Sequence, residues 1–244
     1  MYHEFVYVSG EKVRNCVPMR TAWWQGLRVR KLGAGLKFSP VEASLDVEPT
    51  AIAEDDRRLG KLMEYLDGSG RYYTEPDVDR GEWVMFEGHI GMALVDTEPA
   101  PGAVLFCEAE PLAVTTPRIV LHGSAQHLRA SVSPTTGGAP PERRGGYSVA
   151  THANVARILD AASKAHRAAP PGGLRRLFGG SAEDSTDLEQ NLATYFREVA
   201  CTAEYRDFAP YLGGHARITA VLRPPSLPFP VIMASPLYVR YERP

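Results

Sequence analysis

The sequence predicts an α+β fold built on a large, mainly antiparallel β-sheet or partly open barrel, with about four helices. Strand-like runs stand at both ends of the chain, and helical patterns stand between them. Several runs alternate apolar and polar residues, which is typical of a strand with one face in the core and the other in water. The regular strand–helix rhythm of a parallel sheet does not occur in the sequence.

The N-terminal part of the chain shows two strand patterns and two helical patterns. Residues 5–8 form a short apolar run that ends at a Ser-Gly pair, which predicts a central strand, and residues 11–17 predict a short helix. Residues 41–47 alternate with period two and predict a half-buried strand. Apolar residues recur at helical spacing between positions 52 and 66, and Gly68 is expected to end that helix.

The rest of the chain alternates between strand and helix patterns. Residues 81–96 predict two strands that meet at Gly88, and residues 149–167 carry the apolar stripe of a helix. Thr186 and Glu189 form a capping-box pattern that predicts the start of a further helix. The remaining predicted strands are residues 104–107, 119–121, 216–223, 231–234 and 237–241.

Segments rich in Pro and Gly give the expected domain organisation. Residues 1–130 are predicted to be a β-rich part with the first helix and a Gly-Ser turn, followed by a flexible linker or loop at 131–147. Residues 148–244 are predicted to add helices and a C-terminal β-hairpin that complete the same domain. A second such segment, 168–185, contains LRRLF at 174–178 and is expected to be a lid, a docking peptide or disorder.

Composition is that of an ordinary globular protein of 244 residues with a formal charge of −2. The chain as a whole has no basic field, so nucleic acid is not an expected partner. Cys16, Cys107 and Cys201 are widely spaced without a CxxC motif, which predicts neither disulfides nor a zinc knuckle. The sequence shows no signal peptide and no apolar run near the roughly 20 residues that cross a bilayer. We therefore expect a cytoplasmic protein that does not insert in membranes.

The strongest candidate for a binding site is the turn at His122, Gly123 and Ser124. Ser124 is expected to cap a helix over residues 125–128, whose backbone N–H groups and dipole would hold an anionic group. Gly123 would allow that group to approach closely, and His122 would stand at the end of the strand. The alternative is an ordinary strand-to-helix turn with a capping serine.

His215 and Arg217 are the residues expected to complete this site from the far end of the chain. Two glycines precede His215 and permit an unusual backbone or a close ligand. If their strand lies beside the strand that ends at His122, the three side chains converge. The alternative for Arg217 is a strand arginine in water.

Catalytic signatures are not present in the sequence: there is no GxSxG elbow, P-loop, GxGxxG, HExxH or EF-hand pattern. The spacing of His122 and His127 does not place both on one helical face, so no metal ion is predicted. Glu87 and His89 project to the same side of an extended chain, either as an acid–base pair or as a plain polar pair. Cys107 lies in an apolar strand and is expected to be inert core. The sequence leaves the cofactor unknown.

Four stretches together resemble a family of actinobacterial proteins: FVYVSGEKV, GEWVMFEGHI, IVLHGSAQHL and GGHARITAVL, the last followed by SPLYVRY. The resemblance is to an uncharacterised family with a YVS…K opening and an LHGS..HL centre. It covers the β-rich ends and leaves out residues 130–185. It implies a cytoplasmic bacterial protein that is an accessory or sensory component beside signalling or defence proteins. It implies no activity, cofactor or catalytic residue.

The sequence thus predicts a binding or sensory module that holds a small anionic ligand or a peptide. One alternative is a hydrolytic enzyme that uses histidines, with or without a metal, drawn from His89, His122, His127 and His215. The second alternative is a structural partner in a complex, docked through residues 174–178. The sequence leaves open the ligand, the reaction and the oligomeric state.

Overall fold

The computed structural model describes residues 4–15, 51–68, 70–95, 102–110, 115–129, 152–168 and 187–243. The chain divides into two compact units, Met1–Ser9 with Ser69–Pro244, and Gly10–Gly68. The predicted α+β fold with a large, mainly antiparallel sheet is confirmed, because the described part of the first unit contains a seven-stranded sheet. The predicted linker at 131–147 and strand at 41–47 lie outside the described residues, as does the segment at 168–185 apart from Ala168.

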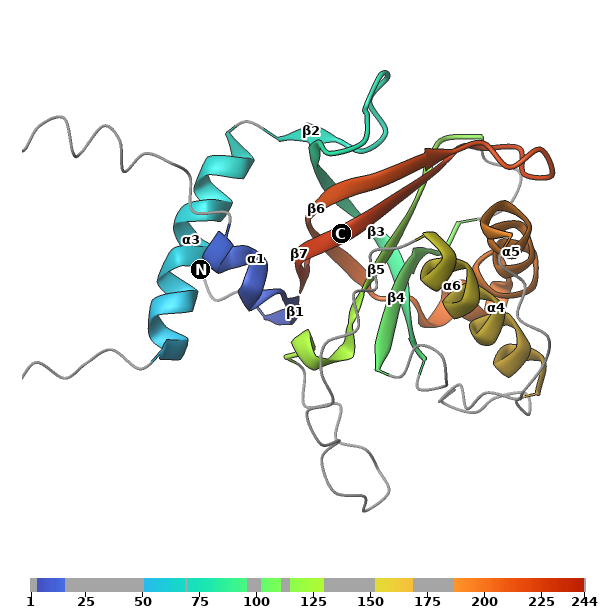
Figure 1. Ribbon diagram of the computed structural model, residues 1–244, viewed down its shortest axis with the longest axis horizontal. Helices are drawn as coiled ribbons and strands as arrows, with labels where there is room; N and C mark the ends of the chain where they lie inside the picture. Colours follow the sequence, from blue (N-terminus) through green and yellow to red (C-terminus); the bar gives the residue numbers. More distant parts are fainter. Residues whose placement is uncertain are drawn as a thin grey trace, which may run out of the picture. The chain divides into compact units, whose positions relative to one another are not determined.

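Five strands of the sheet close into a barrel (Figure 1). Around the barrel, β3 is followed by β4, β5, β7 and β6, and β6 pairs again with β3. The β5–β7 pair is parallel and the other four neighbouring pairs are antiparallel. A five-stranded Greek-key barrel with this strand order has the topology of the oligonucleotide- and oligosaccharide-binding (OB) barrel. The five strands are β3 (Trp83–Val95), β4 (Ala103–Glu108), β5 (Arg118–Ser124), β6 (Tyr211–Leu222) and β7 (Val231–Tyr241).

The barrel closes because β3 pairs with two different strands along its length. Its first half, from Trp83 to His89, pairs with β6, and its second half, from Ile90 to Val95, pairs with β4. The change of partner falls beside Gly88, which has a φ of 158°. The prediction of two strands that meet at Gly88 is therefore wrong. The backbone stays extended through this point and only the strand that receives its hydrogen bonds changes.

Two short strands extend the sheet beyond the barrel. β2 (Arg71–Tyr72) runs parallel to β3, and β1 (Phe5–Val8) runs antiparallel to β7 at the end of the sheet. Residues 5–8 form a strand as predicted, but the prediction that this strand is central is wrong, because β1 lies at the end of the sheet. The apolar run is buried for another reason: Val6 and Tyr7 pack into the barrel interior.

Two apolar layers hold the first unit together. All five barrel strands send side chains into the interior, among them Phe86, Phe106, Leu121, Ile218 and Val239. The second layer lies between the outer side of the barrel and the helices that connect β5 to β6 (Figure 1). The helices are α4 (His152–Ala168), α5 (Leu188–Tyr195), the π-helical turn η2 (Phe196–Ala200) and α6 (Ala203–Phe208).

Local sequence explains where these helices begin and what they bury. The stripe predicted for α4 is confirmed, because Ile158 and Leu159 lie in the second apolar layer. The cap of α5 is Asp187, whose carboxylate accepts a hydrogen bond from the Gln190 N–H at 3.1 Å, and the predicted cap Thr186 lies outside the described residues. Capping by Asp satisfies an amide that the helix cannot bond internally.

The second unit contains two described helices, α1 (Gly10–Asn15) and α3 (Ala51–Asp67), which pack against each other. The predicted helix over residues 52–66 is confirmed, with Leu59, Leu62 and Leu66 among its buried side chains. In the described parts of the chain, no helix combines the length and the apolar character needed to cross a bilayer.

Gly91 of β3 offers a test of how closely the helical layer packs on the barrel. A Cβ atom at this position would overlap the ring of Tyr205 on α6. We therefore expect Gly91→Ala to lower the free energy of unfolding by about 1–3 kcal/mol in urea titrations followed by circular dichroism. Gly60→Ala on α3 is the control, because no atom lies within 4 Å of its Cβ position and alanine favours a helix by about 1 kcal/mol. Equal midpoints for Gly91→Ala and the wild type would contradict the packing.

Candidate functional site

The turn predicted to hold an anion is built differently from the expectation. β5 ends at Ser124 and a single 3₁₀ turn, η1 (Ala125–His127), follows. Ser124 has an extended backbone and makes no side-chain capping hydrogen bond. The Ala125 N–H donates to the Gly102 carbonyl at 2.6 Å. The predicted helix cap at Ser124 is therefore wrong, and the first amide of the turn already has an acceptor from the chain itself.

Gly123 permits a close approach, and the group that approaches is an aromatic ring of the same chain. A Cβ atom at Gly123 would overlap the phenol of Tyr7. Burial raises the pKa of Tyr7 above its ordinary value, against the opposite effect of its hydrogen bond to the backbone of Ser124. The small residue in this turn thus makes room for the tyrosine of β1.

The two histidines of the predicted site are engaged with different partners. His122 is buried, and its Nε2 lies 3.0 Å from the Thr219 hydroxyl of β6. The Ser235 hydroxyl donates to the His122 carbonyl at 3.4 Å. His215 is also buried, and its Nδ1 lies 2.8 Å from the Tyr238 hydroxyl.

Strand register separates the predicted site residues. β7 lies between β5 and β6: Ser235 faces Arg217 in the register with β6, whereas His215 faces Tyr238. The contact of His122 on β6 is Thr219, four residues along that strand from His215. Arg217 is exposed and donates through Nε to the Gly81 carbonyl at 3.0 Å. The structure thus brings His122 to β6 at Thr219, while His215 and Arg217 lie elsewhere on that strand.

The remaining two candidate histidines, His127 and His89, each contact the ring of a different tyrosine. The ring of His127 meets Tyr7 edge-on at 5.7 Å between centroids, and His89 meets Tyr211 in the same way at 5.4 Å. His89 Nδ1 lies 3.1 Å from the Ala209 carbonyl oxygen. Among the residues that the structure describes, no group of three or more His, Cys, Asp or Glu side chains is placed to hold a metal ion.

A buried ion pair, which the sequence patterns did not indicate, lies at one end of the barrel. Arg118 is only 1% exposed, and its Nη1 lies 3.6 Å from Glu108 Oε1. Glu108 Oε2 accepts from the Ile119 N–H at 3.3 Å, and the Tyr73 hydroxyl donates to the same carboxylate. The guanidinium also stacks over Phe229 at 5.1 Å from the ring centroid. In sequence, these charges look like the solvated ends of apolar strands.

Burial dominates the electrostatics around this pair. It raises the pKa of Glu108, and Arg118 and the Tyr73 hydrogen bond counteract this only in part. Burial also raises the pKa of the Cys201 thiol to about 11 and that of Cys107 well above its ordinary value. Thiolates, and not thiols, are the nucleophiles, so neither cysteine is activated. The prediction that Cys107 is inert core is confirmed by its complete burial in the outer apolar layer.

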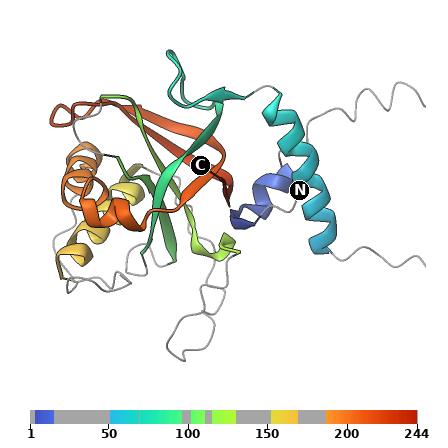
Figure 2. The same ribbon diagram turned by 180° about the vertical axis from the view of Figure 1, so that it is seen from behind.

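The end of the barrel where α6 leads into β6, beside β3 (Figure 2), carries the exposed Phe208 and the half-buried Tyr72 and Tyr211. Phe208, the last residue of α6, is 80% exposed. The ring of His89 contacts the carbonyl oxygen of Ala209, the residue after Phe208, and also the ring of Tyr211. On the neighbouring strand, the Tyr72 hydroxyl donates to the Glu87 carbonyl at 3.1 Å. We call this surface the Tyr211 face and define it by Tyr72, Glu87, His89, Phe208, Tyr211 and Glu242.

Carboxylates place a negative potential on the rings of the Tyr211 face. Burial and, second to it, the charge of Glu87 raise the pKa of Tyr72 to about 12. The pKa of Tyr211 is raised by burial and then by Glu87 and Glu242. Both phenols therefore stay protonated at neutral pH, and the hydroxyl of Tyr72 is already donated to the Glu87 carbonyl. No sequence pattern assembles these residues, because they come from four elements, β2, β3, α6 and β6, and from Glu242 beyond the end of β7.

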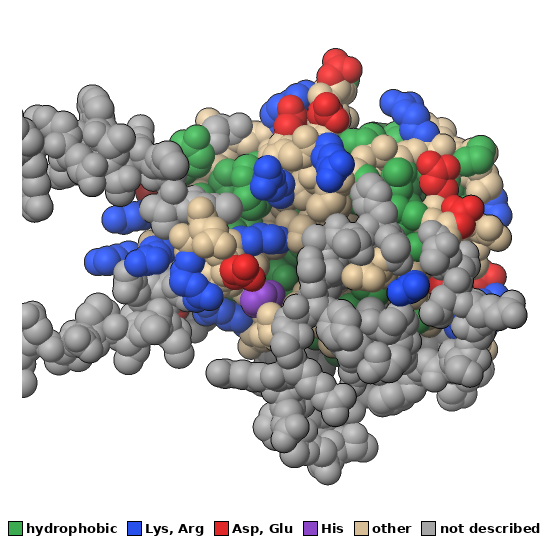
Figure 3. All heavy atoms as spheres, viewed as in Figure 1, with side chains coloured by type: hydrophobic (Ala, Val, Ile, Leu, Met, Phe, Trp, Pro, Cys, Tyr) green, Lys and Arg blue, Asp and Glu red, His purple; other side chains and the backbone are tan. Residues whose placement is uncertain are grey.

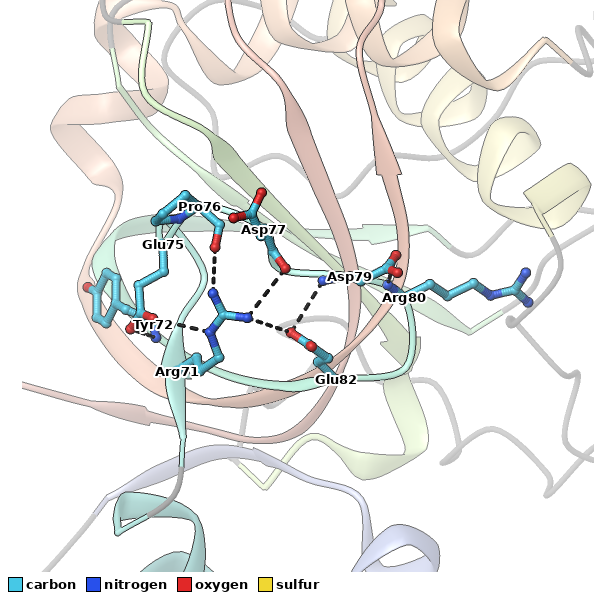
Figure 4. A network of polar contacts seen from close by, with 8 residues as sticks. All are labelled: Arg71, Tyr72, Glu75, Pro76, Asp77, Asp79, Arg80 and Glu82. Carbon is cyan, nitrogen blue, oxygen red and sulfur yellow. Dashed lines mark hydrogen bonds and ion pairs between the residues drawn. The ribbon is translucent and has the colours of Figure 1, made fainter.

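The loop after β2 is organised around one guanidinium (Figure 4). Arg71 bonds the carboxylates of Glu75 at 3.2 Å and Glu82 at 3.4 Å, and the carbonyls of Pro76 and Asp77. Acidic side chains consequently cluster over this loop, at the top of Figure 3. Arg71 thus takes the central position that a cation would take, and it fixes β2 and Tyr72 beside β3.

The pH dependence of stability tests the buried carboxyl. Folding raises the pKa of Glu108 above 4.5, so the folded chain binds a proton more tightly than the unfolded chain. The stability from this group is present in full below pH 4.5 and is lost as the pH rises through the raised pKa. We expect Glu108→Gln to flatten the free energy of unfolding against pH over that window. The exposed control Glu64→Gln should keep the wild-type profile, and parallel profiles for all three proteins would contradict the assignment.

Comparison with known proteins found no matching family model, no similar curated protein and no similar solved structure. The resemblance to an actinobacterial family, the cytoplasmic location and the link to signalling or defence therefore stay predictions. The function is argued below from the site alone.

Proposed function

We propose that the chain is a non-catalytic binding module that docks a segment of a partner protein on the Tyr211 face. The observation that carries this proposal is Phe208, which is 80% exposed and next in the chain to Ala209, whose carbonyl oxygen contacts His89. Aromatic side chains at protein interfaces supply large apolar area and are frequent hot spots of binding energy. Burial of such a side chain in an interface would contribute about 1.5–3 kcal/mol.

The barrel topology supports this location, because the outer face of β4 and β5, a usual ligand surface of such barrels, is covered in this chain. OB barrels bind ligands across the face of their second and third strands, which correspond to β4 and β5 in this chain. The outward side chains Leu105 and Val120 of these strands are buried in the apolar layer under α4 and α5. The usual ligand surface is thus occupied by the chain's own helices, and nucleic-acid binding there gains no support.

The predicted anion site at Ser124 gives the proposal no support either. The Gly102 carbonyl accepts the hydrogen bond of the first amide of the turn, and the phenol of Tyr7 occupies the space beside Gly123. Of the two ligands that the sequence analysis left open, we retain the peptide. The docking segment predicted at 174–178 lies outside the described residues.

Panning of a phage-displayed random peptide library against the full chain tests the proposal. We expect enriched peptides that bind the wild type and lose at least about tenfold in affinity for Phe208→Asp, because a charged side chain removes the apolar anchor. Tyr65→Asp on α3 is the matched control, since Tyr65 is also an exposed aromatic, at 52%. Peptides that bind both variants as well as the wild type, or no enrichment, would overturn the Tyr211 face.

A hydrolytic enzyme is the second candidate, and one observation favours it. A carbonyl oxygen only accepts hydrogen bonds, so the contact with Ala209 places the proton of neutral His89 on Nδ1. Its Nε2 then carries a lone pair on an exposed side chain, on the same strand face as Glu87. This is the arrangement of a general base that is oriented by the backbone.

Hydrolysis of 4-nitrophenyl acetate tests the second candidate. If His89 is a general base, His89→Ala should lower the rate by about 10²-fold or more, the range for general-base catalysis. His127→Ala serves as the control for the background reaction of any accessible imidazole. Equal rates for both variants and the wild type would remove the enzyme hypothesis for His89.

A further inference from the structure

We infer that the segment bound at the Tyr211 face is basic and presents arginine or lysine side chains to it. This inference rests on the proposed function and adds the chemistry of the partner.

Acidic side chains outnumber basic ones around the Tyr211 face. The chain segments next to it are joined by backbone hydrogen bonds: Tyr241 to Glu4, Glu242 to Tyr211, and Ala109 to His89. In these segments and on α6, six carboxylates stand against three guanidiniums, a difference of three negative charges. The entire chain has a formal charge of only −2. The carboxylates are Glu4, Glu87, Glu110, Glu204, Asp207 and Glu242, and the guanidiniums are Arg206, Arg240 and Arg243.

The charges nearest the rings are negative. Glu87 is exposed and lies on β3 between Tyr72 and Tyr211, both of which sense its charge. Arg240 is held by Glu242, and its guanidinium lies 5.7 Å from the ring centroid of the buried Tyr238. The guanidinium of Arg240 is thus engaged within the sheet. A cation from a partner would meet Glu87 and the open ring of Tyr211.

Aromatic rings and carboxylates together recognise cations. The face of a tyrosine ring attracts an ammonium or guanidinium group, and a nearby carboxylate adds a charge-assisted hydrogen bond. The apolar stems of lysine and arginine can cover Phe208 while their charged ends reach Glu87. A neutral apolar segment would leave Glu87 desolvated without a partner, and an acidic segment would be repelled.

Fluorescence anisotropy with labelled poly-L-lysine and poly-L-glutamate tests the sign of the charge. The full chain is expected to bind poly-L-lysine, to bind poly-L-glutamate at least about tenfold more weakly, and to lose affinity for poly-L-lysine as salt increases. Glu87→Lys should weaken the binding of poly-L-lysine by about tenfold. Glu64→Lys, the same change at an exposed position of α3, should leave it within about twofold of the wild type.

The outcomes separate this inference from the proposed function. Phage-displayed peptides that depend on Phe208 but are neutral or acidic would overturn the basic segment and leave the docking face standing. Equal loss of poly-L-lysine binding in the Glu87 and Glu64 variants would likewise overturn it, because attraction would then follow net charge alone. Enriched peptides that are rich in arginine or lysine and lose affinity for both Phe208→Asp and Glu87→Lys would support both.

Discussion

The double pairing of β3 is the constraint on which the rest of the first unit depends. Because Trp83–His89 bonds β6 and Ile90–Val95 bonds β4, the strand bridges the two ends of the sheet and closes it into a barrel. Closure gives the barrel an interior for one apolar layer and an outer wall for a second. The same point of exchange holds His89 beside Ala209 and thereby anchors the junction of α6 and β6.

Polar side chains at this end of the barrel link the interior to the surface through β2. Arg71 turns outward and holds the acidic loop, Tyr72 reaches the carbonyl of Glu87, and Tyr73 turns inward to the buried carboxylate of Glu108. Three successive residues thus connect a loop, a surface and a buried ion pair. A buried pair contributes little net stability, but the loss of one partner leaves an uncompensated charge, so it favours one arrangement of strands over others.

Several glycines of the barrel leave space for other parts of the same chain and not for a ligand. In isolation, Gly91, Gly123 and Gly214 look like places where a ligand approaches the backbone. In the fold, each leaves space for another part of the chain: the ring of Tyr205, the phenol of Tyr7, and the Tyr238 carbonyl with Phe86, in that order. The proposed docking surface lies instead at the exposed Phe208 and the half-buried Tyr211.

The sequence by itself determined the elements, because hydrophobic period and caps act within a few residues. It predicted the α+β class, the residues that form β1, the helix α3 and the stripe of α4. Tertiary structure decided which strands pair, since pairing depends on register across β7 and on the switch at Gly88. It therefore decided that His122 meets Thr219, while His215 meets Tyr238. The Tyr211 face draws on four separate elements, and its carboxylates and rings become neighbours only after the barrel has closed.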